Sequence, residues 1–262
     1  MPSTEHERPA DELVSLLARR IEVLEALLDQ PRTRPELVET LDISRSTVDR
    51  AVRELEGMAL VEYEDDLYRA SLAGRLAHRE YAELREELVV LEEATELLAV
   101  LPPDAPLDLT VLQGGNVVLA REPAPHVPGT QLANLLEGAD EVRSLSMAYT
   151  TPETGEVLAE GVRSGGTEAS LVFERGLYEY LLDSDALDIE TLLADPDFEG
   201  AVTEGLPFGL VIARTDDTRE VCIAVYDADR ALRGIIRNDT PAALEWAESI
   251  WTQYWETATL VE

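Results

Sequence analysis

The sequence contains no lysine: all 21 basic residues are arginine, and they are outnumbered by 54 aspartate and glutamate residues. Without lysine there can be no P-loop lysine, no lysine Schiff base and no histidine–lysine catalytic pair. A net charge of −33 is tolerable where molar salt shortens the Debye length to about 3 Å and screens the repulsion between carboxylates. We therefore expect a halophile that keeps molar salt in its cytosol, an archaeon in particular. The alternative is an ordinary acidic protein.

Cysteine, histidine and long apolar runs are also scarce. Cys222 is the only cysteine, which excludes an internal disulfide and a thiolate zinc cluster. His6, His78 and His126 are widely scattered and indicate no metal site. No apolar run approaches the roughly 20 residues of a membrane span, and no signal-type segment opens the chain. We expect a soluble, cytoplasmic protein with no metal, no cofactor and no membrane partner.

Residues 33–55 contain two short helical patterns joined by a turn at residues 42–44. Thr33 and Glu36 have the spacing of a capping box at the start of the first helix, and Ser44 is a natural N-cap for the second. In the second pattern, apolar residues recur at the spacing of one helix face, namely Val48, Ala51, Val52 and Leu55. The opposite face then carries arginines and small hydroxyl residues.

A third helix and a hairpin complete this N-terminal region. Leucines at helical spacing between residues 13 and 28 predict a helix in front of the pair. Residues 60–63 and 67–70 predict two strands joined by an acidic turn at residues 64–66. Three helices followed by a β-hairpin are the order of a winged helix-turn-helix, in which the second helix of the pair enters the major groove of DNA.

A long helical pattern follows, from residue 72 to residue 101, and ends at the proline-rich segment 102–106. A helix of about 25 residues is about 38 Å long, which is more than a winged domain needs for its own core. We therefore expect its surplus apolar stripe, from Leu76 to Leu98, to contact a partner chain or to connect the domains. The predicted domains are a winged helix-turn-helix at 1–75, a linker and dimerisation helix at 76–106, and a regulatory domain at 107–262.

Strand and helix patterns alternate in the last domain. We expect helices near 130–137, 152–163 and 177–182, and a terminal helix capped by Thr240. Strands are expected at 109–112, 117–120, 142–149, 170–174, 208–214, 221–226 and 232–237, with a hairpin turn at 114–116. The last three strands are separated by aspartate-containing turns, which predicts an antiparallel meander. The predicted fold class is α+β and multidomain, with an N-terminal winged helix-turn-helix and a C-terminal α/β domain that has a mixed sheet.

Several short motifs resemble those of a known family. The motifs are Ala73-Gly74 after the wing, residues 206–210 (Leu-Pro-Phe-Gly-Leu), the turn at Tyr226-Asp227, and Asn238-Asp239 before a tryptophan-containing terminal helix. The chain is similar, over about residues 12–75 and 107–258, to archaeal winged-helix transcriptional regulators with the methanogenesis-regulator (Fil-type) middle domain. Many of these are haloarchaeal. The resemblance implies DNA-binding transcriptional control and an effector domain whose ligand is undefined.

The outward side of the helix that begins at Ser44 is the candidate DNA-binding surface. Its first turn would lie deepest in the groove, so hydroxyl and guanidinium groups there reach base edges. Arg34, at the positive end of the preceding helix, suits a phosphate, and two residues of the wing suit the DNA backbone or the minor groove. The alternative is a solvated helix face. The candidates are Arg34, Ser44, Arg45, Ser46, Thr47, Arg50, Arg53, Tyr68 and Arg69.

A ligand site is expected at the end of the strand predicted at 142–149, because open α/β sheets bind small molecules at strand ends. Tyr149, Thr150 and Thr151 lie there. Arg163 and Arg175 are scarce cations in an acidic domain, so together these residues suit an anionic metabolite. The alternative for the arginines is surface pairing with neighbouring acids.

We therefore predict a homodimeric transcriptional regulator that binds double-stranded DNA and responds to a small-molecule effector. One alternative is an interaction module whose winged domain binds another protein, for which the acidic charge is the best argument. Another is a small-molecule enzyme with a DNA-binding appendage. The mixed sheet and Pro125-His126 faintly resemble phospholipase-D-like folds, but the catalytic lysine is absent. We expect no enzyme, and no catalytic residue is predicted.

Overall fold

The computed structural model of the chain describes residues 8–149, 151–184 and 186–261. It consists of two compact units, Met1–Glu86 and Glu87–Glu262, each with its own hydrophobic core. The division falls within helix α4 (Leu72–Leu98), whereas the sequence predicted a separate segment at 76–106.

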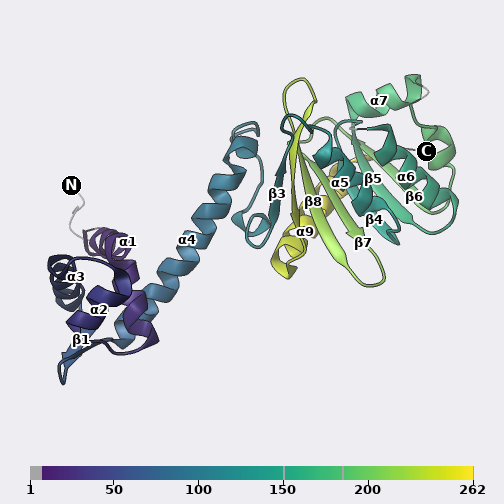
Figure 1. The fold of residues 1–262 in the computed structure, drawn as a ribbon. Helices are drawn as coiled ribbons and strands as arrows, with labels where there is room; N and C mark the ends of the chain where they lie inside the picture. Colours follow the sequence, from purple (N-terminus) through teal and green to yellow (C-terminus); the bar gives the residue numbers. More distant parts are fainter. Residues whose placement is uncertain (1–7, 150, 185, 262) are drawn as a thin grey trace. The chain divides into compact units, whose positions relative to one another are not determined.

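The first unit has the predicted order of three helices and a hairpin (Figure 1). Its elements are α1 (Arg8–Asp29), α2 (Arg34–Leu41), α3 (Arg45–Gly57), β1 (Val61–Glu64) and β2 (Leu67–Ala70). The strands pair antiparallel. The caps explain why the helices begin where they do, since Thr33 forms the capping box of α2 with Glu36, and Ser44 accepts from the amide of Thr47 at the start of α3.

The core of this unit gathers one face of each helix and one side of the wing. Leu24, Leu37 and Leu55 are fully buried in it, and so is the ring of Tyr68 from β2. The backbone of Tyr68 exchanges two hydrogen bonds, of 2.9 and 2.8 Å, with that of Arg32. This pairing holds β2 against the helices, and the Tyr68 ring is buried there. The wing is therefore joined to the segment that precedes α2.

The N-terminal half of helix α4 packs with the first unit, and its C-terminal half packs with the second. Ala77 and Tyr81 pack against the core of the first unit, whereas Ala94 and Leu97 are buried in the core of the second. The middle of the helix leaves apolar side chains exposed, among them Leu84, Leu88 and Leu91.

The second unit is built on an eight-stranded mixed sheet with the order β10-β6-β5-β4-β7-β8-β9-β3. The strands β4, β5 and β6 are parallel, and all other neighbours are antiparallel. The α+β, multidomain fold class and the mixed sheet are thus confirmed. The bounds are β3 (Asn116–Leu119), α5 (Val127–Leu136), β4 (Glu141–Ser146), α6 (Pro152–Arg163), β5 (Glu168–Glu174), α7 (Arg175–Asp183), α8 (Ile189–Leu193), β6 (Phe198–Thr203), β7 (Gly209–Arg214), β8 (Arg219–Tyr226), β9 (Leu232–Asn238), α9 (Pro241–Thr257) and β10 (Thr259–Val261).

One predicted strand was wrong: residues 109–112 form a short 3₁₀ helix, η1 (Leu109–Val111), capped by Asp108. The segment after it is held by the side-chain amide of Asn238, which donates hydrogen bonds of 2.8 Å to the carbonyl oxygens of Val111 and Gln113. Residues 114–116 are therefore not the turn of a hairpin, because a hairpin turn joins two strands and only the segment after them, β3, is a strand. The expectation failed because the contact with Asn238 joins residues more than a hundred positions apart.

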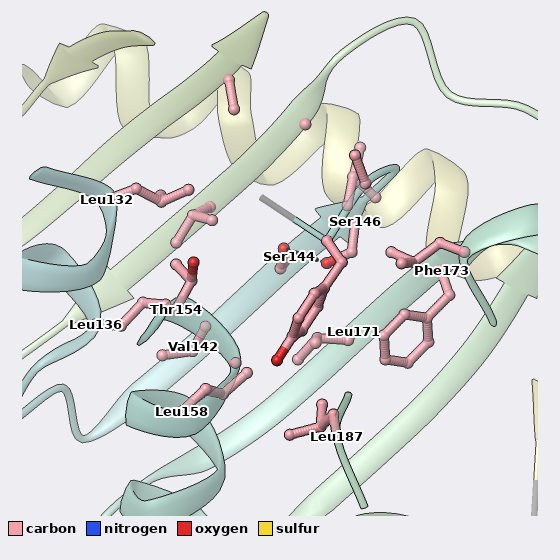
Figure 2. Close-up of a pocket in the computed structure, with 18 of the residues that line it drawn as sticks. Leu132, Leu136, Val142, Ser144, Ser146, Thr154, Leu158, Leu171, Phe173 and Leu187 are labelled. Atoms are coloured by element: carbon pink, nitrogen blue, oxygen red, sulfur yellow. Dashed lines mark hydrogen bonds between the residues drawn. The ribbon is translucent and has the colours of Figure 1, made fainter. Parts of the chain in front are cut away.

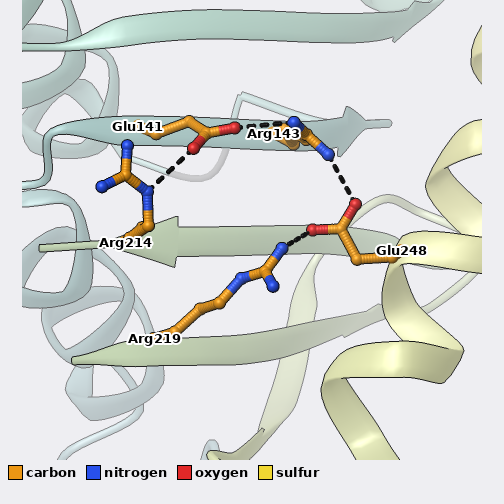
Figure 3. Close-up of polar contacts among 5 residues, drawn as sticks. All are labelled: Glu141, Arg143, Arg214, Arg219 and Glu248. Carbon is orange, nitrogen blue, oxygen red and sulfur yellow. Dashed lines mark hydrogen bonds and ion pairs between the residues drawn. The ribbon is translucent and has the colours of Figure 1, made fainter. Parts of the chain in front are cut away.

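Helix α9 is fixed to its face of the sheet by a chain of ion pairs (Figure 3). The guanidinium of Arg143, on β4, lies 2.8 Å from a Glu141 oxygen and 2.6 Å from a Glu248 oxygen on α9. It also lies 5.1 Å from the centre of the Trp251 ring. Glu248 pairs in addition with Arg219. The terminal helix is thus held by charge and by an aromatic contact as well as by apolar packing.

In the part of the chain that the structure describes, no helix combines the length and the apolar character that a membrane crossing requires.

Candidate nucleic-acid interface

Helix α3 begins with an open positive end. The Ser44 hydroxyl accepts from the amide of Thr47 at 3.2 Å and lies 2.9 and 2.8 Å from the hydroxyls of Ser46 and Thr47. The first turn of α3 contains no acid, and these residues are exposed. Because the first amides of a helix have no partner within it and the helix dipole is positive there, this end favours an anion.

The start of helix α2 is already occupied by the protein's own carboxylate. An oxygen of Glu36 accepts from the amide of Thr33 at 2.6 Å and from its hydroxyl at 2.8 Å. These hydrogen bonds from Thr33 lower the pKa of Glu36. Of the two helix starts in the helix-turn-helix, α3 is therefore the one open to an external anion.

The arginines of α3 are available for a ligand. Arg45, Arg50 and Arg53 are exposed, and among the described residues none of them lies in an ion pair within 4.0 Å. Arg20 on the neighbouring helix, by contrast, is 2.9 Å from the carboxylate of Glu54. The outward side of α3 thus presents three free cations in a protein whose net charge is strongly negative.

Arg34 is anchored between the wing and α3. Its Nε atom donates a hydrogen bond of 2.7 Å to the Tyr68 hydroxyl and lies 3.5 Å from an oxygen of Asp49. The hydrogen bond to Tyr68 is the main cause that raises the pKa of Arg34. The side chain is 46% exposed, so its terminal nitrogens stay accessible beside α3. Asp49 was not singled out from the sequence; its ion pair with Arg34 shows that it lies on the side of α3 that faces the start of α2.

The prediction that Tyr68 contacts DNA was wrong, because its side chain is only 1% exposed and its ring packs in the core. Arg69 pairs with Glu64 across the hairpin. The wing is otherwise acidic at its tip, where its exposed residues include Glu62, Asp65 and Asp66. A hairpin of this charge repels phosphates, so α3 and the start of α2 are the better candidates for an interface with DNA.

The residues predicted to bind an effector are only partly brought together. Tyr149 and Thr151 line a cavity of about 100 Å³ in the second unit, while Thr150 lies outside the described residues. Arg163 and Arg175 do not line this cavity. They pair with nearby acids instead, at 3.8 Å to Glu160 and 2.6 Å to Glu204.

The cavity offers little for catalysis. Its wall is mainly leucine, valine and phenylalanine (Figure 2). The lining residues that carry a hydroxyl group are Ser144, Ser146, Tyr149, Thr151, Thr154 and Tyr226. Cys222 is buried elsewhere on β8, where burial raises the pKa of its thiol to about 12, so it is not a thiolate nucleophile. The described residues hold no cluster of three or more histidine, cysteine or acidic side chains that suits a metal ion.

Two known sequence families match the chain. Residues 125–257 match the family described as methanogenesis regulatory protein FilR1, middle domain. Residues 10–93 match the HVO_A0261 N-terminal domain. No curated protein matches the chain.

Solved structures show distant similarity. TrmBL2, an archaeal chromatin protein whose structure shows a novel mode of DNA binding, has 16% identity and a TM-score of 0.42 over 96% of this chain and 99% of its own. Nuc, a phospholipase D family member from Salmonella typhimurium, has 13% identity and a TM-score of 0.42 over 56% of this chain and 97% of its own. The mitomycin 7-O-methyltransferase MmcR has 15% identity and a TM-score of 0.24 over 66% of this chain and 57% of its own. These similarities are too low to decide function.

Proposed function

The chain belongs to the family of the methanogenesis regulatory protein FilR1, and on that premise we propose that it is a transcriptional regulator that binds double-stranded DNA through helix α3. The observation that carries the proposal is the contrast between the helix starts. The amide end of α3 is open and flanked by Arg45 and Arg50, whereas Glu36 fills the end of α2. Such a helix start suits insertion into a major groove, with hydroxyl and guanidinium groups at base edges.

In this proposal the residues have distinct roles. Arg45, Ser46 and Thr47 contact bases from the first turn, and Arg50 and Arg53 contact bases or phosphates further along the helix. Ser44 fixes the start of the helix, and Arg34 contacts a phosphate while it is held by Tyr68.

In this proposal the protein acts as a homodimer in the cytoplasm of a halophilic archaeon. The exposed leucines of α4, which lie on one helix face at positions 84, 88 and 91, supply the dimer contact. A two-fold dimer would place two α3 helices about one DNA turn apart, roughly 34 Å, on a pseudo-palindromic site. The second unit serves as a sensor and not as an enzyme.

The proposal is tested by selecting duplexes from a random DNA pool with the full-length protein in molar KCl, followed by binding titrations. We expect Arg50→Ala to weaken the selected site by about 5- to 100-fold, because one good base contact contributes about 1–3 kcal/mol. Arg75→Ala is the matched control, since it removes the same charge from an arginine that is exposed on α4 and lies in no ion pair among the described residues. It should change affinity less than twofold.

The rival function, recognition of a protein partner by the winged unit, gives a different result. If no duplex is enriched, or if both arginine variants weaken binding equally, α3 is not a DNA-reading helix. A protein partner whose binding survives Arg50→Ala would favour the rival.

A further inference from the structure

We propose that the cavity in the second unit binds a small uncharged molecule, mostly apolar, that carries one oxygen acceptor. The molecule's role as an effector rests on the proposed DNA-binding function, whereas its binding does not depend on that function.

The cavity lies between one face of the sheet and the helices α5–α8 (Figure 2). Its wall includes Leu132 of α5, Leu158 of α6, and Leu171 and Phe173 of β5. An engineered apolar cavity of about 150 Å³ binds benzene, so a cavity of about 100 Å³ holds roughly four or five non-hydrogen atoms. Its size and its apolar wall together select a compact ligand.

Two serines on the central strand β4 supply the polar contact. Ser144 and Ser146 are two positions apart and so lie on the same side of the strand, and their hydroxyl oxygens are 3.0 Å apart. Ser144 is only 5% exposed. Burying a hydroxyl among apolar side chains is costly unless it is hydrogen-bonded. The mutual hydrogen bond uses one of the two hydroxyl protons, so the pair keeps one proton to donate towards the cavity.

Two neighbouring hydroxyls are already committed to the protein. The Tyr149 hydroxyl donates to the carbonyl oxygen of Ala186 at 2.8 Å, and the Thr154 hydroxyl donates to that of Thr151 at 3.0 Å. The serine pair therefore supplies a donor that these groups do not, and a ketone, ester or ether oxygen matches it.

Charge in and around the cavity disfavours an anion. None of the described side chains that line it is charged. An adjoining, more open pocket of about 390 Å³ shares Tyr149 and Leu177 with it and contains Glu174 and Arg230. One oxygen of Glu174 pairs with Arg230, while the other is buried and has no hydrogen-bond partner among the described residues. A carboxylate ligand would enter beside this oxygen and lose its own hydration without gaining a cation.

Three probes with the same five-atom framework test the inference. They are butanone, the alkene 2-methyl-1-butene and propanoate, each titrated into full-length protein with ¹³C-labelled leucine and valine methyl groups in molar KCl. We expect butanone to shift the methyl signals of Leu158 and Leu171, the alkene to bind more weakly, and propanoate to leave both signals unchanged. Either serine can donate within the pair, so the double variant Ser144→Ala/Ser146→Ala is used to remove the donor. It should weaken butanone about three- to tenfold, the effect of losing one hydrogen bond, and leave the alkene unaffected.

Ser170→Ala is the matched control, because Ser170 lies on β5 next to Leu171 and points to the opposite face. It should leave all three titrations as they are. The inference is overturned if butanone shifts neither signal, if propanoate binds as well as butanone, or if the double variant Ser144→Ala/Ser146→Ala leaves the preference for butanone over the alkene intact. Binding of butanone without any change in affinity for a selected duplex would remove the effector role alone. Failure to select a duplex would remove the DNA-binding proposal and leave the methyl titrations standing.

Discussion

The backbone of Gly74 in α4 lies against the carbonyl oxygen of Leu60, so closely that a Cβ atom on Gly74 would be 2.1 Å from that oxygen. The Gly74 amide also donates to the Ser71 hydroxyl at 3.0 Å, and that hydroxyl donates to the Ala59 carbonyl. Glycine is therefore required where α4 leaves the wing. This contact explains why the Ala73-Gly74 motif follows the hairpin.

Gly74→Ala should destabilise the first unit by about 1–3 kcal/mol or more, because backbone atoms must shift to admit the methyl group. Hydrogen exchange of peptides from residues 10–70 measures the effect. Gly57→Ala is the control: Gly57 ends α3 with nothing within 4 Å of its added Cβ, so it should be neutral or slightly stabilising. All three tryptophans lie on α9, so their fluorescence should show the second unit unchanged. Equal exchange in both variants would contradict the prediction.

Tyr68 should matter for stability and not for DNA recognition. Tyr68→Ala removes a buried ring, and we expect a loss of about 3–5 kcal/mol in the first unit, as for other buried aromatics. Tyr68→Phe keeps the ring and removes only the acceptor of Arg34, so operator affinity should stay within about threefold of the original. A loss as large as that of Arg50→Ala, with unchanged hydrogen exchange, would restore Tyr68 to the DNA interface.

Local signals in the sequence predicted most of the helices and strands, and also which side of α3 faces outward. Capping by Thr33, Ser44 and Thr240 located helix starts, because a cap depends on residues within one turn. The apolar spacing of α3 likewise decided which arginines are exposed. The strands β6 and β10 were not predicted, since β6 contains Gly200, β10 has only three residues, and both acquire their partners from distant segments.

The candidate sites show the same limit. Tyr68 is buried through its backbone pairing with Arg32, a distant contact that the four-residue strand pattern does not reveal. Ser144 and Ser146 look like the polar side of an exposed strand, and only the position of β4 in the middle of the sheet makes them unusual. A pair of serines at i and i+2 between apolar residues was the available signal.

The second unit should lose stability in acid through Glu141. The hydrogen bond from Arg214, at 2.9 Å, is the main cause that lowers the pKa of Glu141, and Arg143 adds to it. A carboxylate whose pKa is lower in the folded state stabilises the fold above its unfolded pKa, about 4.3. This contribution is lost as the pH falls through the folded pKa.

Glu141→Gln should therefore lower the free energy of unfolding of the second unit at pH 7 and make it less dependent on pH below about 4.3. Urea unfolding followed by tryptophan fluorescence measures this free energy. Glu199→Gln is the control, because Glu199 on β6 is exposed and lies in no ion pair among the described residues. Parallel stability curves for Glu141→Gln and the original protein across this range would refute the assignment.

Salt should first strengthen and then weaken DNA binding. Residues 1–80 contain 11 arginines and 18 acids, a net charge of −7, whereas residues 81–262 contain 10 arginines and 36 acids, a net charge of −26. Repulsion between this acidic part and DNA is screened as KCl rises from low concentration. At higher KCl the loss of counterion release dominates, with log K falling by about 0.9 per phosphate contact per log unit of salt. A monotonic decrease across a gel-shift titration would contradict this order.

The exposed face of α4 gives the last prediction, which concerns assembly. Leu88 is 53% exposed in the middle of the helix, with Leu84 and Leu91 on the same side, so a charge there should oppose the pairing of two copies. In molar KCl, where the acidic surfaces are screened, light scattering should give the original protein twice the chain mass of 28.9 kDa. Leu88→Glu should give a single chain. Leu182→Glu is the matched control, since Leu182 is 44% exposed on α7 and its substitution should leave the dimer intact. Operator affinity should fall with the dimer, because one α3 helix then reads only a half-site. A monomeric original protein, or a dimer that withstands the glutamate at position 88, would exclude α4 as the contact.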